Sequence, residues 1–221
     1  DPTTEVLTIS NTGGNNLEWQ LSIGDHEEHD HRTTLEILGW TWVNSSYYDD
    51  TFDALNEHFT DYNLTTSTTY DADIFEDELE GKDLLVITTA NYMNNVDEAL
   101  HTVLQNFVSS GGGVIFTGQN NDNFNDNFGG LFEEAYTYSS TCCNYTWNTN
   151  EFDSSHPIME GIDTLSIYRP YSTYVNDHDV QVIHNTDIWG ENYPSTFVKE
   201  FGKGKVVVLG TRFENWSGGS D

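Results

Sequence analysis

Basic residues are scarce in this chain of 221 residues, which holds 7 Lys and Arg against 37 Asp and Glu and has a formal net charge of −30. A surface this acidic repels the phosphates of nucleic acids and anionic lipids, so we expect neither as a partner. Cations, a saline exterior and neutral glycans remain compatible with it. Aromatic residues make up 14% of the chain, and this content predicts a folded core rather than a disordered chain.

Cysteine and long apolar runs are also nearly absent. The two cysteines, Cys142 and Cys143, are neighbours and cannot link distant parts of a fold. Free thiols, a vicinal disulfide and pairing with another chain all remain open. No apolar stretch approaches the length of a membrane span, so we expect no membrane insertion, and no signal peptide is recognisable. Because the chain starts at Asp1-Pro2 without Met, we interpret it as a processed or excised piece.

Two short segments near the N-terminus alternate polar and apolar residues, as β-strands do. Residues 5–10 and 17–23 flank a turn at 11–16, which predicts a hairpin. A lone hairpin is marginal in water, so these strands should pair with the edge of the main domain or be donated to a neighbouring copy. In a donated segment, the contacting side chains would be Val6, Leu7, Ile9, Leu17, Trp19, Leu21 and Ile23.

Two segments hold weak candidates for metal ligands, namely His26, His29, His31, Asp122 and Asp126. The histidines of the 24–32 linker match no zinc spacing, and a solvated polar linker is the favoured interpretation. Residues 120–130 resemble a calcium loop in composition, but two phenylalanines interrupt its register. We therefore expect no metal and no cofactor, with calcium at 120–130 as an open alternative.

From residue 33 the chain alternates strands and helices, which predicts an α/β domain with a parallel sheet. Strands are expected at 34–40, 63–70, 83–88, 114–116, 179–183, 196–200 and 205–209, and helices at 49–59, 73–79, 96–109 and 131–135. Residues 201–205 should form the hairpin turn between the last two strands. The sequence thus divides into an N-terminal strand segment and linker at 1–32 and an α/β domain at 33–221.

The clearest local signal lies at 111–120, where three glycines end a helix, a short apolar strand follows, and Thr117-Gly118-Gln119 leaves the sheet. Together with 83–88, 156–162 and 201–210, this order of motifs resembles the class I glutamine amidotransferase-like superfamily over about residues 33–215. It is most similar to accessory domains of secreted proteases and surface proteins. The resemblance implies a flavodoxin-like fold. The N-terminal strands resemble the edge of an Ig-like β-sandwich module of secreted bacterial proteins.

The departure from that superfamily concerns its nucleophile. Related amidotransferases and hydrolases place a Cys at a strand-to-helix elbow, with a His partner. Here the turn carries Thr117, Gly118 and Gln119, and the cysteines come about 25 residues later. A hydrolase remains an alternative, with its site at strand ends near Trp40, Asn91, Thr117, Gln119 and His156. His156 more often marks a structural turn in this motif.

Four Asn-x-Ser/Thr sequons occur, at Asn44, Asn63, Asn144 and Asn215. Chance alone gives about this number, but all four fall at expected loops or strand ends, where glycans attach. Residues 215–221 resemble a flexible linker. We therefore predict an extracellular or cell-surface, non-catalytic structural or adhesive module. It would associate with other copies head to tail into a filament or tandem array and could carry glycans.

A carbohydrate- or calcium-binding module is the remaining alternative. Its aromatic platform would be drawn from Trp40, Trp42, Tyr47, Tyr48, Trp147, Tyr168, Tyr171 and Tyr174, although such residues more often fill a core.

Overall fold

The computed structural model describes residues 34–41, 52, 55–57, 59–88, 96–117, 130–132, 135–138, 144–148, 153, 155–159, 164–168, 172–175, 177, 179–188 and 191–209. The chain divides into two units, and all the described residues belong to the second, Thr33–Asp221.

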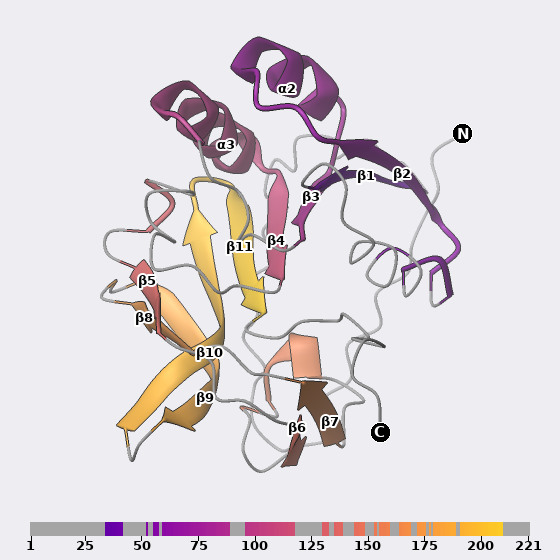
Figure 1. Cartoon of the computed structure of the whole chain (residues 1–221). Helices are drawn as coiled ribbons and strands as arrows, with labels where there is room; N and C mark the ends of the chain where they lie inside the picture. The colour runs from indigo at the N-terminus through magenta and orange to yellow at the C-terminus, as the bar shows by residue number, and fades with distance from the viewer. Residues whose placement is uncertain are drawn as a thin grey trace, which may run out of the picture. The chain divides into compact units, whose positions relative to one another are not determined.

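A seven-stranded sheet organises this unit, with the strand order β2-β1-β3-β4-β11-β10-β9 (Figure 1). The strands are β1 (Leu35–Trp40), β2 (Tyr62–Ser67), β3 (Leu84–Ile87), β4 (Gly113–Thr117), β9 (Val180–Ile188), β10 (Glu191–Phe201) and β11 (Gly204–Leu209). The first five in spatial order run parallel, whereas β10 is antiparallel to both β11 and β9. This is the flavodoxin-like order, with β11 as the fifth parallel strand. The predicted α/β fold class is confirmed, in a mixed rather than wholly parallel sheet.

Two helices, α2 (Ala72–Leu79) and α3 (Glu98–Ser110), cover one face of the sheet (Figure 1). Each begins at an Asp whose side chain accepts backbone N–H bonds, Asp71 from Asp73 and Ile74 and Asp97 from Leu100. Gly111 ends α3 with φ +124°, a conformation that favours glycine. No helix in the described parts of the chain is long and apolar enough to cross a membrane.

Apolar side chains on the two faces of the sheet form separate clusters. On the helix face, strand residues such as Leu85, Phe116 and Val206 pack against Phe75 and Leu104 of the helices. On the opposite face, a smaller cluster holds Ile37, Val86 and the helical residue Phe52. Residues 52 and 55–57 are helical, within the helix predicted at 49–59, whereas Phe59 lies outside the helix. Successive residues of a strand therefore pack on opposite faces of the sheet, as expected of a parallel sheet that is covered on both faces.

Two short antiparallel pairs were not predicted. They are β5 (Ala135–Tyr138) with β8 (Ser172–Val175) and β6 (Asn144–Asn148) with β7 (Thr164–Tyr168), and a 3-10 turn, η3 (Pro157–Met159), lies between β6 and β7 in the chain.

The predicted helix at 131–135 is wrong. Leu131 and Phe132 form a bend, and β5 begins at Ala135. The two apolar residues are buried anchors in the core, with Phe132 edge-on to Phe197 at 5.7 Å between ring centroids. The following Tyr and Thr residues favour strand over helix.

The predicted hairpin between the last two strands is confirmed. Phe201 pairs with Gly204 across a turn in which Gly202 has φ +62°.

Candidate functional site

Three threonines form a row at the carboxyl ends of three adjacent parallel strands. Thr41 and Thr88 directly follow β1 and β3, and Thr117 is the last residue of β4. We call these residues the threonine row. The strand order reverses between β1 and β3, and ligands of open α/β sheets bind outside the strand ends at such a point. The row therefore occupies the position where this fold would hold a ligand or a catalytic group.

The threonine row is buried and only partly satisfied by hydrogen bonds. Thr41, Thr88 and Thr117 are 5%, 2% and 4% exposed. The Thr88 amide donates to Trp40 O at 3.3 Å, and Thr117 Oγ1 donates to Ile87 O at 3.4 Å. Thr88 Oγ1 is buried without a hydrogen-bond partner among the described residues. Buried polar groups are nearly always bonded, so Thr88 Oγ1 is an exception among the described residues.

The chemistry that the threonine row offers is hydrogen bonding. A hydroxyl becomes a nucleophile when a base lies beside it. The described residues that end β1, β3 and β4 are hydroxyl or apolar side chains, with no His, Cys or carboxylate among them. Such a row suits neutral polar groups, and these described strand ends supply no general base.

Trp40 does not belong to a binding surface, so its place in the predicted aromatic platform is wrong. Its side chain is fully buried, and its ring lies 4.5 Å from that of Phe75. The indole Nε1 donates to Thr69 O at 2.9 Å, which satisfies its only donor. Trp40 is a core residue beneath the sheet end.

His156 does not share a cavity with the threonine row. It lines a cavity of about 720 Å³ with Asp179, Glu200 and Lys205. Lys205 pairs with Gly113, the first residue of β4, while Thr117 is its last. Four residues of strand span about 13 Å. The predicted grouping of His156 with Thr117 is therefore wrong. The Ile158 amide donates to His156 Nδ1 at 3.2 Å, which fits a structural turn.

The structure contains a Ser–His pair that no sequence motif indicated. His184 on β9 and Ser195 on β10 lie with Nδ1 and Oγ 2.6 Å apart. Their exposed fractions are 3% and 0%. Burial lowers the pKa of His184 to about 4, which keeps the ring neutral near neutral pH. A hydroxyl sealed in this way cannot reach a substrate, so the pair is part of the core.

A buried ion pair lies on the same antiparallel part of the sheet. Lys199 Nζ contacts Asp177 Oδ2, with both side chains almost fully buried. The ammonium also lies 5.6 Å from the ring centroid of Phe132 and 5.9 Å from that of Phe201. These contacts tie the segment before β9 to β10 and the bend at Phe132.

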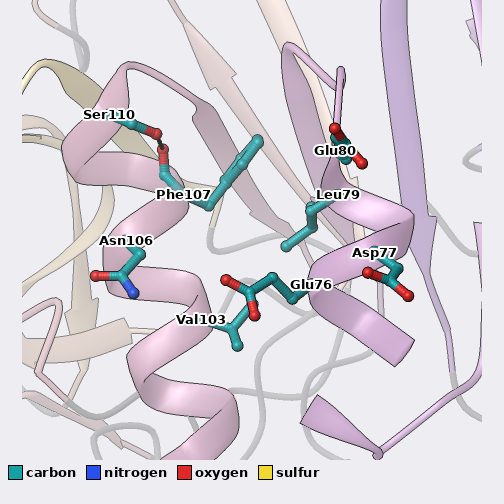
Figure 2. A pocket seen from close by; sticks show the side chains of 8 residues that line it. All are labelled: Glu76, Asp77, Leu79, Glu80, Val103, Asn106, Phe107 and Ser110. Carbon is teal, nitrogen blue, oxygen red and sulfur yellow. Dashed lines mark hydrogen bonds between the residues drawn. The ribbon is translucent and has the colours of Figure 1, made fainter. Parts of the chain in front are cut away.

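A second cavity, of about 430 Å³, lies between α2 and α3. Figure 2 shows Leu79 of α2 and Val103 and Phe107 of α3 around it, with carboxylates such as Glu76 and Glu80 nearby. Its described lining residues include three carboxylates and no basic side chain. It therefore disfavours anionic ligands.

Many predicted site residues lie outside the described residues. They are the seven self-association residues, His26, His29, His31, Asn44, Asn91, Gln119, Asp122, Asp126, Cys142, Cys143 and Asn215, together with Trp42, Tyr47, Tyr48 and Tyr171. Asn144 and Trp147 lie on β6, Tyr168 on β7 and Tyr174 on β8. Asn63 is exposed on β2, where its Nδ2 donates to Glu36 Oε1 at 2.6 Å. The described residues contain no group of three or more His, Cys, Asp or Glu placed to hold a metal.

Two of the solved structures that match the chain illustrate the shared fold. A β-galactosidase from Bacillus circulans sp. alkalophilus matches with a TM-score of 0.52 and 9% identity over 79% of this chain. The match covers 28% of that enzyme, so this chain corresponds to little more than a quarter of its length. A protein described as a GMP synthase subunit from Thermoplasma acidophilum matches with a TM-score of 0.51 and 14% identity, over 82% of this chain and 85% of that one. At these identities the likeness concerns the fold alone.

No curated protein sequence matches the chain. A family model described as "ThuA: Trehalose utilisation" matches residues 37–212, most of the α/β unit. The chain therefore belongs to the ThuA family and has the class I glutamine amidotransferase-like fold that its sequence motifs indicated.

Proposed function

We propose that this chain is a non-catalytic structural module of the cell surface or exterior, which associates with other copies of itself head to tail. The observation that carries the proposal is the threonine row. Where enzymes of this superfamily carry a nucleophile and its base, the described strand ends carry Thr41, Thr88 and Thr117. A sheet end with these residues supports a scaffold role. Glycosylation at the exposed Asn63 is part of the same proposal.

Assembly of this module depends on salt. Each copy carries a formal net charge of −30, so copies repel one another until ions screen the charge. The screening length is about 10 Å at 0.1 M salt and about 3 Å at 1 M. Contacts between copies therefore become favourable as the ionic strength rises.

Light scattering of the full chain tests the proposal. We expect small species at about 0.1 M NaCl and large assemblies at about 1 M, which electron micrographs should show as filaments. A chain that stays monomeric at all salt and protein concentrations would refute self-association. If the chain hydrolysed a peptide or a glycoside, and both Thr88→Val and Thr117→Val abolished that hydrolysis, the non-catalytic role would be refuted.

A neutral-glycan site at the threonine row is the second candidate function. Within the described part of the chain, Thr88 Oγ1 is a buried hydroxyl without a bonding partner at the point where the strand order reverses. The family description names trehalose, and one structural neighbour is a β-galactosidase. Titration calorimetry with trehalose and galactose tests it. Thr88→Val should abolish the binding heat, whereas Thr65→Val on β2 should leave it unchanged. If Thr88→Val bound the sugar with the same heat as the parent chain, this site would be excluded.

A further inference from the structure

We propose that the outer edge of β2 accepts residues 17–23 of a second copy as an added strand. This inference rests on the self-association proposed above and names the surface that serves it. We call residues 17–23 the donor segment. The occupant is thus a second copy of this chain, bound through main-chain hydrogen bonds.

The backbone of β2 presents hydrogen-bonding groups on that edge. Among the described strands, β2 ends the sheet and pairs with β1 alone. Leu35 N donates to Asp61 O at 2.9 Å and Thr41 N to Ser67 O at 3.0 Å. In a parallel ladder, alternate residues bond the same neighbour, so the odd-numbered residues of β2 face β1.

The even-numbered residues of β2 therefore face outward. They are Tyr62, Leu64 and Thr66, each of which carries one amide and one carbonyl on the outer edge. Three donors and three acceptors in a row form a template for another strand.

The β2 edge also lacks the features that protect edge strands. Its six residues include no Lys, no Pro and no charged side chain, and its register with β1 is unbroken. The opposite edge of the sheet differs. There the Asp153 amide donates to Ile183 O of β9 at 2.9 Å, and β9 and β10 change register beside Pro194. Of the two described edges, β2 is therefore the better template.

The donor segment fits this edge in length and in pattern. Its seven residues match the six of β2, and apolar side chains occupy every second position from Leu17 to Ile23. Tyr62 and Leu64 of β2 pack against the opposite-face cluster. Phe59, three residues before β2, is 60% exposed. An added strand with its apolar row on this face would extend that cluster and cover exposed apolar surface.

Charge favours a second copy over the chain's own segment. The linker at 24–32 carries four carboxylates and precedes β1 with its Glu36, while Asp61 and Asp83 stand at the starts of the neighbouring strands. Like charges extend such linkers. A second copy is therefore the occupant that we propose for this edge.

Three full-length variants test the inference. Thr66→Pro removes an outward amide while leaving the bonds to β1, since proline is tolerated where the N–H faces out of the sheet. Thr66→Val keeps the amide and is the matched control. Trp19→Asp combined with Leu21→Asp disables the donor segment. Far-UV circular dichroism at low salt should show that each variant remains folded.

We expect Thr66→Pro and the donor variant each to lose at least about tenfold in association constant at high salt, while Thr66→Val assembles like the parent. An equimolar mixture of the two defective variants should form a 1:1 dimer and nothing larger, because one supplies the strand and the other the edge. This complementation would support the inference even if Thr66→Pro were less stable.

Two other outcomes would overturn it. If Thr66→Pro assembles like the parent chain, the β2 edge is not the contact, although self-association would stand. If the parent chain is monomeric and its Tyr62, Leu64 and Thr66 amides resist hydrogen exchange, its own segment covers the edge. That second result would also remove the proposed function.

Discussion

His184 gives the fold a pH dependence whose size follows from its burial. The ordinary pKa of the ring is 6.5, and burial lowers it to about 4 in the folded chain. Between these values the unfolded chain binds a proton at His184 that the folded chain excludes. The free energy of unfolding therefore falls as the pH drops from 6.5 to about 4. At about 1.4 kcal/mol per pKa unit, the loss is about 3 kcal/mol at pH 4 and approaches about 3.5 kcal/mol below it.

The perturbation that isolates this contribution is His184→Asn. Asparagine does not titrate, and its amide can replace Nδ1 in the contact with Ser195. Urea unfolding of both proteins between neutral pH and pH 4 gives the difference in free energy at each pH. Taking the difference removes the titration of the 37 Asp and Glu that both proteins share. We expect the parent chain to lose about 3 kcal/mol more than the variant over this range.

Parallel stability curves for the parent and His184→Asn would refute this reasoning, because they would mean that the ring protonates equally in both states. Ser195→Ala is the control. It removes the hydroxyl but leaves His184 buried, so it should cost about 1 kcal/mol at neutral pH. Since burial is the cause of the lowered pKa, the pH dependence should persist in this variant.

Other predictions concern single contacts, each measured by urea unfolding. Asp177→Ala should lower the free energy of unfolding by roughly 3–5 kcal/mol, because it leaves the buried ammonium of Lys199 without this carboxylate. Replacing both residues by apolar ones should lower it less. Gly204→Ala should cost about 2 kcal/mol or more, since a Cβ there would collide with the backbone at the end of α3. Gly81→Ala, whose Cβ would meet open space, should cost only the strain of φ +74°, about 1 kcal/mol. Thr88→Val should be neutral or stabilise by about 1 kcal/mol, because it removes a buried hydroxyl that has no partner among the described residues.

The parallel half of the fold could be predicted because its signals are local. The apolar run of β3, the spacing of the apolar residues in α3 and the glycines that end it all lie within short windows. Gly111 takes the positive φ that its position at the helix end suggested. Each of these elements carries its own periodicity, so its type could be predicted without knowledge of its neighbours.

The strand pairs β5–β8 and β6–β7 could not be predicted in the same way. Each strand has four or five residues, mostly Tyr, Thr, Ser and Asn, and the alternation of polar and apolar residues in β6 and β7 extends over only five positions. What makes them strands is pairing with a partner that is distant in sequence. Leu131 and Phe132 illustrate the same limit, since a short apolar pair can begin a helix or anchor a bend.

The sequence predicted where the candidate site lies but not which residues form it. The carboxyl end of β4 was expected to be the informative place, and Thr117 does end that strand. Neighbouring strands bring Thr41 and Thr88 beside it, and no sequence motif links these three residues. His156 was grouped with Thr117 because both belong to motifs of one superfamily. The cavity that His156 lines reaches β11 at Lys205 and Val207, which pair with Gly113 and Ile115 of β4, and it includes no residue of the threonine row.

The distribution of charge decides where two copies can meet. The eight residues of α2 include four carboxylates, and three carboxylates line the cavity between α2 and α3 (Figure 2). The six residues of β2 include no charged side chain. Bringing the helix surfaces of two copies together sets carboxylates against carboxylates at distances shorter than the screening length of about 10 Å at 0.1 M salt. Contact along β2 places no charged side chain of β2 itself at the interface, so edge association should need less salt than contact between the helix surfaces.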